Sequence, residues 1–392
     1  MISVEQAKKL IQEHTTALNP VQIQLSEAAG HTLAQDICAS CDIPAFRQSS
    51  MDGYALKFEE NLAELCLAGE MAAGSDKENT INQGEAYRIF TGAALPNGAD
   101  TVIMQEKVTI EGDRVFLNDP NLKAGINARE KGSEISTGEI AMTRGSQLTP
   151  AALGFLAGIG TTEVSVYPQP KIAIILTGNE LQKPGLPLNF GQVYESNSYA
   201  LKAALRQAGI SSIEVLEAKD DLETLTEVLN ATLKTNDMIL LTGGVSVGDY
   251  DFVIQAAGNC GVKQIFHKVK QKPGKPLYFG TKQNQLIFGL PGNPSSVLSC
   301  FYNYVLPAIA LLSNTTSKIQ QIEAQLTAAY QKPGGLTHFL KGRYDAGKAT
   351  ALGAQESYRL SSFAQANCLI CLEEEKTDFK IGDKITVFLL PN

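Results

Sequence analysis

The sequence of 392 residues lacks the features of a membrane or secreted protein. No apolar run reaches the roughly 20 residues that span a bilayer, and the longest candidates, near Val305–Leu312 and Lys171–Leu176, are far shorter. The first residues, MISVEQAKKLIQEH, contain no apolar signal-peptide core and have the pattern of an amphipathic helix with Ser3 and Gln6 spaced as a capping box. We therefore expect a soluble, cytoplasmic protein.

Histidine and cysteine are scarce. The four histidines show no His-x-His or His-x-x-x-His spacing, and the seven cysteines are odd in number. Reduced thiols are expected in a chain without a signal peptide. The pairs Cys38/Cys41 and Cys368/Cys371 have the C-x-x-C spacing of zinc ligands, but the second pair lies in a predicted strand, where residues i and i+3 point to opposite faces. Structural packing of these thiols is therefore favoured over a metal site.

Acidic residues are absent from Phe252 through Ile322, although the chain has 41 of them in 392 residues. The formal net charge of −8 argues against a general binder of nucleic acid or anionic membranes. Within the acid-free segment, four lysines crowd the string KVKQKPGK at 268–275. In an acidic protein this string is either a site that captures anions or a solvated surface hairpin.

Composition and periodicity divide the chain into regions. Residues 1–40 and 133–166 are predicted to form a helical N-terminal or linker domain, in which Thr149 caps a helix that begins at Pro150. Residues 41–132, with many turns and short strands, predict a small β-rich domain inserted between the helical parts. Residues 316–392 predict a β-barrel-like C-terminal domain.

Residues 167–315 alternate between strands and helices and predict an α/β domain. The strands Lys171–Leu176, Ile213–Leu216 and Met238–Leu241 are separated by helices near Ser198–Ala208 and Leu222–Leu233. A βαβαβ order implies a doubly wound parallel sheet. The expected fold is therefore a multi-domain α/β protein organised around this sheet.

Three apolar strands of this region end in similar glycine-bearing loops. The loop residues are Thr177 and Gly178 after the first strand, Thr242, Gly243, Gly244, Ser246 and Gly248 after the next, and Pro291, Gly292, Asn293 and Pro294 after the last. Ligands of open α/β sheets bind beyond the carboxyl ends of the strands, where glycine lets them approach backbone N–H groups. Asn293 is a natural N-cap before Pro294, and such a helix start attracts an oxyanion. One such loop would be a plain turn, but three at one edge predict a phosphate site.

Carboxylates follow the same strand ends. Glu180 follows the first strand, Asp220 and Asp221 follow the second, and Asp249 and Asp251 follow the third. Several carboxylates beside phosphate-binding loops suit Mg²⁺ or another divalent cation, for which Glu180, Asp249 and Asp251 are the expected ligands. The alternative for Asp220 or Asp221 is that one of them caps the following helix.

Eight strings spread along the chain carry a resemblance. They are FRQSSMDGYA (46–55), RIFTGAALPNGADTVIMQE (88–106), GINAREKGSEI (125–135), TGNEL (177–181), TGGVSVGDYDFV (242–253), QKPGKPLYFG (271–280), GLPGNPSS (289–296) and SSFAQANCLICLE (361–373). In this order they resemble the molybdopterin molybdenumtransferases of the MoeA and gephyrin E-domain family. Glu134 stands where such proteins often carry Asp, so no site role is assigned to it.

The resemblance implies a Mg²⁺-dependent transferase that inserts molybdenum from molybdate into adenylylated molybdopterin and releases AMP. It also implies a four-domain homodimer in which the site lies between the molybdopterin-binding sheet domain of one subunit and the small β-domain of the other. The residues that it places at the site are Asp52 and Thr91, supplied by the partner subunit, and Glu180, Asp220, Asp251, Lys268, Lys272, Lys275, Pro291, Pro294 and Ser362. By inference, Glu180 and Asp251 act near the metal and the pterin phosphate, and the lysines hold phosphate or molybdate. Asp52 and Thr91 order the adenylate or the reacting sulfurs.

Three other functions remain open at this point. A molybdopterin adenylyltransferase performs the preceding step with ATP on a similar sheet domain, but it is usually one short domain. A non-catalytic molybdopterin-binding scaffold is disfavoured by the intact Glu180, Asp251 and lysines, and storage or delivery of molybdate is the third alternative. Candidate partners are the upstream pterin adenylyltransferase and downstream molybdoenzyme maturation factors, whereas no nucleic acid or membrane partner is expected.

Overall fold

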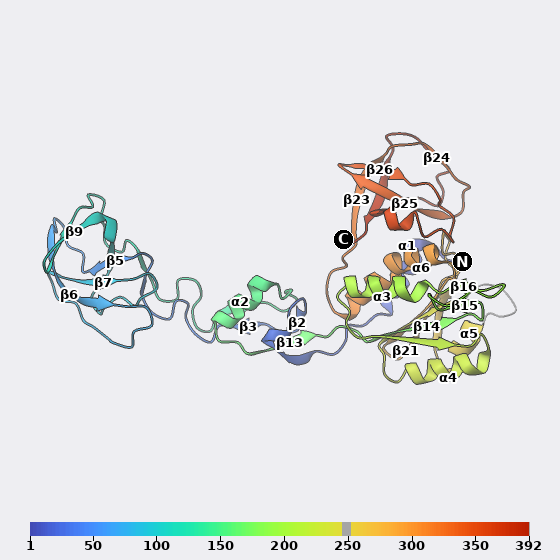
Figure 1. Cartoon of the computed structure of the whole chain (residues 1–392), viewed down its shortest axis with the longest axis horizontal. Coiled ribbons are helices and arrows are strands. Elements are labelled where there is room, and N and C mark those ends of the chain that lie inside the picture. The colour runs from blue at the N-terminus through green and yellow to red at the C-terminus, as the bar shows by residue number, and fades with distance from the viewer. Residues whose placement is uncertain (245–251, 392) are drawn as a thin grey trace. The chain divides into compact units, whose positions relative to one another are not determined.

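The structure, a computed structural model, describes residues 1–244 and 252–391. By their contacts the residues group into two compact units. One consists of Met1–Val21, Gly30–Thr32 and Val166–Asn392, and the other of Gln22–Ala29 and Leu33–Ser165. Figure 1 shows most of the helices in the first unit and mainly strands in the second.

A six-stranded sheet forms the centre of the α/β part. Its strands, in sheet order, are β17 (Ile213–Ala218), β14 (Ile172–Thr177), β18 (Met238–Thr242), β22 (Gln285–Leu290), β21 (Tyr278–Lys282) and β19 (Lys263–His267). The first four run parallel, and β21 and β19 extend the sheet antiparallel. The predicted doubly wound parallel sheet is confirmed, with an antiparallel edge in addition.

Helices cover both faces of this sheet (Figure 1). Successive strand residues point to opposite sides, and β14 shows the consequence. Ile174 belongs to a core shared with α1 (Val4–Glu13) and α3 (Asn197–Gln207), whereas Ile175 belongs to a separate core shared with α4 (Leu222–Thr232) and α5 (Phe252–Asn259). The carboxyl ends of the parallel strands are therefore held between two packed layers.

The prediction that residues 1–40 are helical is wrong beyond the first helix. The cap is as predicted, because the hydroxyl oxygen of Ser3 accepts a hydrogen bond from the backbone of Gln6 at 3.1 Å. After α1 the chain forms only short elements, namely β1 (Val21–Gln24), the 3-10 turn Leu25–Glu27, β2 (Thr32–Leu33) and β3 (Ile37–Cys38). These strands pair with β13 (Glu163–Tyr167) and β12 (Ile140–Met142), so partners distant in sequence override the local pattern.

The helix after the third glycine-bearing loop is longer than its sequence indicates. α6 (Pro294–Cys300), the π-helical η3 (Phe301–Val305) and α7 (Leu306–Leu312) follow one another without a gap. Together they make a 19-residue helix that could cross a membrane by length and composition, so the prediction that the run near Val305–Leu312 is too short is wrong. However, 78% of its most apolar window is buried inside the protein, as in the core helix of a folded domain.

The second unit is built on another six-stranded sheet. Its strands, in sheet order, are β8 (Thr101–Met104), β5 (Gly53–Leu56), β7 (Glu85–Ile89), β6 (Glu64–Met71), β10 (Arg114–Leu117) and β9 (Val108–Glu111). The unit also contains α2 (Pro150–Gly158), whose N-cap Thr149 accepts from the backbone of Ala152 at 3.2 Å, as predicted. A β-rich inserted part is therefore confirmed.

The C-terminal strands close into a barrel. They are β25 (Thr337–Asp345), β26 (Lys348–Ala351), β23 (Gln320–Leu326), β29 (Lys384–Leu389) and β27 (Cys368–Leu372), and closure follows because β25 also pairs with β27. Cys368 packs into the barrel core and Cys371 against the α/β core, so the two thiols diverge as predicted. Within the described ranges, no group of three His, Cys, Asp or Glu side chains could hold a metal ion.

Candidate functional site

The glycine-bearing loops meet at one edge of the α/β sheet. β14, β18 and β22 are neighbours and end at this edge. A Cβ added to Gly243, whose φ is +87°, would lie 2.4 Å from the carbonyl oxygen of Thr177. A Cβ added to Gly292 would lie 3.9 Å from the Cα of Gly243. The structure therefore brings the first residues after these three strands together, and we call the ends of β14, β17, β18 and β22 with the described residues that follow each of them the rim.

Two carboxylates lie beside the glycines of the rim. The oxygens of Glu180 are 2.8 and 2.9 Å from the position that a Cβ on Gly178 would take, so the carboxylate folds back over this glycine. The hydroxyl of Thr177 donates to Asp220 Oδ1 at 3.1 Å. Because Thr177 precedes Gly178, both carboxylates lie around the end of β14.

Asp221, by contrast, is a helix cap. Its Oδ1 accepts from the backbone N–H of Thr224 at 2.8 Å, and its Oδ2 accepts from the Thr224 hydroxyl at 2.9 Å. These hydrogen bonds, the backbone one foremost, lower the pKa of the Asp221 carboxyl. The cap alternative therefore holds for Asp221, and Asp220 is the member of the pair that remains at the rim.

A cavity of about 440 Å³ opens between the ends of β14 and β17. Gly178, Asn179 and Lys219 are part of its lining, as is Lys183, whose ammonium lies 3.1 Å from Glu217. The buried Glu195 closes one side and accepts from both the backbone and the hydroxyl of Ser198, at the start of α3. The cavity walls are mainly polar and carry both signs of charge.

The loop before α6 is held by side chains that sequence reasoning did not single out. Asn197 Nδ2 donates to the Gly292 carbonyl oxygen at 2.8 Å. Asn293 occupies the N-cap position, but its side chain does not cap the helix as predicted. Instead its Nδ2 donates to the hydroxyl of Ser357 at 2.9 Å, and the backbone N–H of Ser295 donates to the Ser357 carbonyl at 3.1 Å. A loop of the barrel therefore contacts the rim directly.

The lysine-rich string is not a solvated hairpin. Its residues Gln271–Lys272 form β20, which pairs in parallel with β25 so that Lys272 lies opposite His338. The following turn is seated on α6, because a Cβ added to Gly274 would meet Cys300 Sγ at 2.5 Å and the Ser296 carbonyl oxygen at 3.7 Å. The exposed Lys272 is thus attached to the helix whose first turn belongs to the rim.

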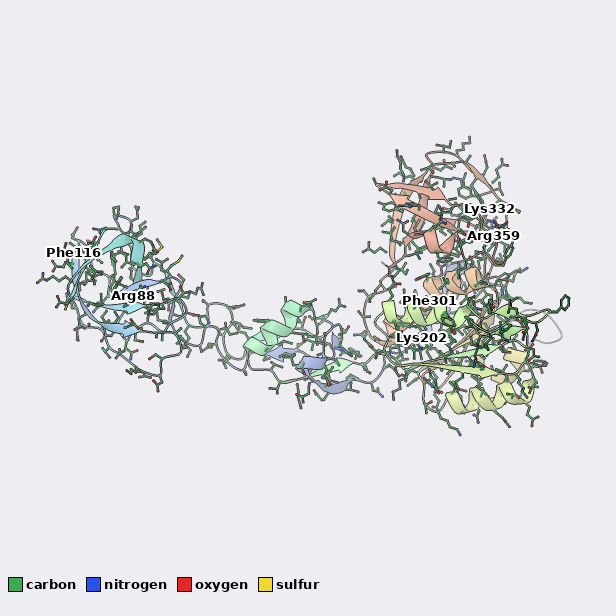
Figure 2. The ribbon with its side chains drawn as sticks, viewed as in Figure 1. Arg88, Phe116, Lys202, Phe301, Lys332 and Arg359 are labelled. Carbon is green, nitrogen blue, oxygen red and sulfur yellow. The ribbon has the colours of Figure 1, made fainter. Side chains whose placement is uncertain are left out.

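The string carries less free positive charge than its composition indicates. Lys270 forms an ion pair with Glu374 at 2.7 Å, so one of its four lysines is neutralised. The neighbourhood of Lys272 is nonetheless cationic. Burial lowers the pKa of His338 to about 4, and the charges of Lys332 and Lys272 add to this effect. Lys332, labelled in Figure 2, is itself buried and donates to the carbonyl oxygens of Leu336 and Glu374.

In the second unit, Asp52 and Thr91 are in contact. The backbone N–H of Thr91 donates to Asp52 Oδ1 at 2.7 Å, and its hydroxyl donates to the same oxygen at 2.8 Å. These two hydrogen bonds, followed by the positive charge of Arg88, lower the pKa of Asp52. The structure therefore shows a carboxylate whose orientation is fixed by Thr91 and whose ionised form is favoured.

Arg88, labelled in Figure 2, is a neighbour that sequence reasoning missed. Its guanidinium carbon lies 4.8 Å from the ring centroid of Phe90, and Nη1 donates to the Gly53 carbonyl at 2.8 Å. Arg88 opens the RIFTGAALP string, so the motif itself was the available signal.

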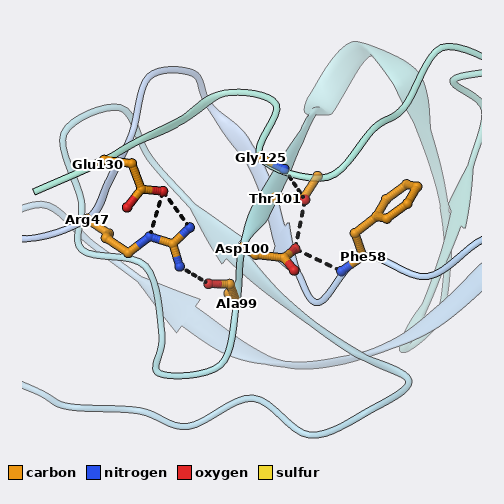
Figure 3. Close-up of polar contacts among 7 residues, drawn as sticks. All are labelled: Arg47, Phe58, Ala99, Asp100, Thr101, Gly125 and Glu130. Atoms are coloured by element: carbon orange, nitrogen blue, oxygen red, sulfur yellow. Dashed lines mark hydrogen bonds and ion pairs between the residues drawn. The ribbon is translucent and has the colours of Figure 1, made fainter. Parts of the chain in front are cut away.

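Polar contacts brace the chain that follows Thr91 (Figure 3). Arg47 donates from Nε and Nη2 to Glu130 Oε1, and from Nη1 to the Ala99 carbonyl at 3.0 Å. Asp100 Oδ1 accepts from the backbone of Phe58 at 2.9 Å and from the hydroxyl of Thr101 at 2.8 Å. These contacts fix the segment 99–101 that leads into β8.

Some of the remaining predicted residues can be placed in the structure and others cannot. Ser246, Gly248, Asp249 and Asp251 lie outside the described residues. Ser362 is buried, and its hydroxyl donates to the Ala354 carbonyl at 2.8 Å. Pro291 and Thr242 are buried at the rim, Gly244 and Pro294 lie there half-buried, and Lys268 and Lys275 flank β20.

Comparison with known proteins gives matches along the whole chain. Residues 2–160 match the MoeA N-terminal region (domain I and II), residues 173–311 a probable molybdopterin binding domain, and residues 323–390 the MoeA C-terminal region (domain IV). A molybdopterin molybdenumtransferase of Haemophilus influenzae is 34% identical over 99% of this chain and 98% of its own length. One of Nostoc sp. is 34% identical over 94% of this chain and 88% of its own length.

Solved structures give the same result. A molybdopterin biosynthesis moeA protein of Pyrococcus horikoshii OT3 superposes with a TM-score of 0.81 at 28% identity, covering 100% of both chains. A second structure of a moea protein from the same genus gives a TM-score of 0.84 at 26% identity, covering 99% of both chains. The chain belongs to the molybdopterin molybdenumtransferase family.

Proposed function

We propose that this protein is a molybdopterin molybdenumtransferase, which inserts molybdenum from molybdate into adenylylated molybdopterin and releases AMP. The observation that carries the proposal is the convergence of Gly178, Gly243 and Gly292 at one rim, with Glu180 and Asp220 around the end of β14 and Lys272 next to a turn that is seated on α6. Its second support is the similarity to named transferases over 99% of the chain.

The rim would bind the polyanionic parts of the substrates. Backbone N–H groups beside Gly243 and Gly292 accommodate phosphate oxygens at close range. Lys272 and Lys275 supply positive charge for molybdate or for the phosphate that departs with AMP, and Lys268, three residues before β20, would add to it.

A divalent cation, Mg²⁺ or a similar ion, is part of the proposal. Glu180 and Asp220 offer the hard oxygen donors that such an ion prefers, and both lie around the end of β14. They supply only part of a ligand set, so Asp249 and Asp251 would complete it. The ion would neutralise negative charge on the phosphoanhydride when the adenylate is cleaved.

The Asp52–Thr91 pair would act from a second copy of the chain, in a homodimer. A carboxylate with a lowered pKa stays ionised at neutral pH, and the two hydrogen bonds from Thr91 fix its orientation. Such a group suits the ordering of the adenylate or of the dithiolene sulfurs. We also propose that the protein works in the cytoplasm, between an upstream pterin adenylyltransferase and downstream molybdoenzyme maturation factors.

The test is AMP release from purified adenylylated molybdopterin on addition of molybdate and Mg²⁺. Asp251→Ala and Lys272→Ala should each lower the rate at least about 100-fold, because Lys272 would supply positive charge to the leaving phosphate and Asp251 would hold the cation that does the same. Lys263→Ala, an exposed lysine on β19, is the matched control and should keep the wild-type rate. Unchanged rates in both site variants would contradict the assignment, and consumption of ATP instead of AMP release would indicate the adenylyltransferase.

A further inference from the structure

The C-terminal barrel contains a lysine that is almost fully buried. Lys341 of β25 is 2% exposed, and its ammonium group donates to the carbonyl oxygens of Ala354, Arg359 and Glu356 at 2.7, 3.0 and 3.3 Å. An ammonium group has three donors, so all of them are used on one loop. Burial of an ammonium is costly unless it is hydrogen-bonded in this way.

The three carbonyls belong to the loop 354–359, which we call the barrel loop. Gln355 adds to its attachment, because its Oε1 accepts from the backbone N–H of Lys341 at 3.0 Å and its Nε2 donates to the Lys341 carbonyl at 2.8 Å. The Ala354 carbonyl also accepts from Ser362 at 2.8 Å. Arg359 of this loop is labelled in Figure 2. Lys341 is therefore the centre around which the barrel loop is folded.

The barrel loop is also the part of the barrel that reaches the rim. Its Ser357 accepts from the backbone of Ser295 through its carbonyl, and from Asn293 Nδ2 through its hydroxyl. Among the described residues, the Ser357 hydroxyl is the hydrogen-bond partner of the Asn293 side chain, in place of the cap that Asn293 would otherwise form. The first turn of α6 therefore depends on the barrel loop for its conformation.

We propose that Lys341 is a positioning residue for the rim: it holds the barrel loop so that Ser357 fixes Asn293 and Ser295 where the oxyanion of the substrate binds. The proposal rests on the proposed function for the identity of the substrate, but not for the contact chain. Lys341 itself touches neither substrate nor reacting atoms. Its loss would remove the ammonium donor from three carbonyls of the barrel loop, of which Ala354 keeps Ser362 as a second donor, so the loop would be held less firmly against β25.

The principal test compares Lys341→Met with Lys384→Met. Lys384 is a barrel lysine whose side chain is 76% exposed, so this control removes the same charge without touching the loop. Lys341→Met should raise the KM for adenylylated molybdopterin at least about fivefold and lower kcat less than about threefold, because the binding groups are displaced and the chemistry is not removed. Lys384→Met should match the wild type in both constants.

A second variant covers the case in which Lys341→Met does not fold. Ser357→Ala removes one hydroxyl from a half-buried position and leaves Lys341 and its carbonyls in place. It should raise the same KM about threefold, and the double variant should be no worse than Lys341→Met alone, because both act through one contact chain. A wild-type KM for Ser357→Ala, or strictly additive effects, would overturn the proposal.

Hydrogen exchange measured by mass spectrometry separates positioning from general destabilisation and does not need activity. In Lys341→Met, exchange should speed up in peptides covering 352–362 and 291–297, whereas β23 and β29 on the opposite part of the barrel should keep wild-type protection. Equal loss of protection throughout the barrel would show a merely structural lysine and overturn the proposal. If wild-type protein released no AMP, the proposed function would fail, and the exchange result would still decide whether Lys341 positions the rim.

Discussion

Gly243 lies so close to Thr177 that a Cβ added to it would be 2.4 Å from the Thr177 carbonyl oxygen. The backbone of Gly243 also has φ of +87°, a region that side chains with a Cβ rarely adopt. Two adjacent strand ends therefore approach each other at a point where only glycine fits. The rim depends on this close approach, since Gly292 faces Gly243 from the third strand.

Gly243→Ala should accordingly lower the free energy of unfolding by more than about 2 kcal/mol, because the new methyl group meets a backbone oxygen in a strained conformation. Urea denaturation followed by circular dichroism measures this. Gly258→Ala is the matched control, because Gly258 lies in α5 with no neighbour within 4 Å of an added Cβ. It should be neutral or stabilise by up to about 1 kcal/mol, since alanine favours the helix. Equal stability of the two variants would contradict the close approach.

The neighbouring residues Asp220 and Asp221 should behave oppositely. Asp221→Ala removes the cap of α4 and should cost about 1 kcal/mol of stability, while AMP release stays near the wild-type rate. Asp220→Ala leaves the cap intact and should reduce AMP release at least about tenfold with little change in stability. Urea denaturation and the AMP assay on both variants check this. Loss of activity in Asp221→Ala alone would reverse the assignment.

Thr91 should control the ionisation of Asp52. Thr91→Val removes the hydroxyl donor, so the pKa of Asp52 should rise toward its ordinary value of 3.8, whereas Thr91→Ser should keep it lowered. Because the folded-state pKa is depressed, the stabilisation from this carboxylate is present above pH 3.8 and is lost as the pH falls through the lowered value. Carbon-13 NMR titration of the Asp carboxyls gives the pKa directly. An identical titration in Thr91→Val and Thr91→Ser would refute this role.

His338 should make the protein less stable in acid. Its pKa is about 4 in the folded protein and 6.5 in the ordinary state, so between these values the unfolded chain binds more protons and stability falls as the pH is lowered. The charged groups around it are Lys272 on β20 and Lys332 before β25, with Glu374 and Glu375 beside Lys332. Over this range the titration of His338 should lower the free energy of unfolding by about 3 kcal/mol, at 1.36 kcal/mol for each pKa unit.

Replacing His338 with Gln, which cannot titrate, should remove this contribution. The difference in unfolding free energy between wild type and His338→Gln should therefore shift in favour of the variant as the pH falls from 6.5 to 4. Urea denaturation at several pH values measures the shift. A constant difference over this window would show that His338 does not stay neutral. Lys263→Gln, at an exposed position, is the control, because its effect on the unfolding free energy should not change between pH 6.5 and 4.

The rim could be predicted from sequence because it depends on residues that directly follow each strand in the chain. β14, β18 and β22 each end in a glycine-bearing loop, and parallel strands must end at the same edge, so Thr177, Thr242 and Pro291 could be placed together from the sequence. The cap of α1 at Ser3 and that of α2 at Thr149 were predictable for the same reason, since each rests on a spacing of three residues.

The contacts that could not be predicted join residues distant in the chain. Asn293 is a residue type that often caps helices, but its side chain donates a hydrogen bond to Ser357, 64 residues later, instead. Residues after α1 have a helical pattern, yet Ile37–Cys38 pairs with Ile140–Met142, more than 100 residues away. In both cases a tertiary partner outweighs a local preference of about 1 kcal/mol.

The pairing of β20 with β25 means that the C-terminal barrel cannot be cut from the rest of the chain without exposing a strand edge. Residues 316–392 contain all five strands of the closed barrel, but Gln271–Lys272 cover the first residues of β25 from outside. A fragment cut at residue 316 would present those unpaired backbone groups to solvent, next to the buried His338, and open strand edges recruit other chains. The barrel is therefore not an independent domain, although its five strands are continuous in sequence. A separate gene for residues 316–392 would need another segment to pair with the start of β25, in place of two residues some 65 positions upstream.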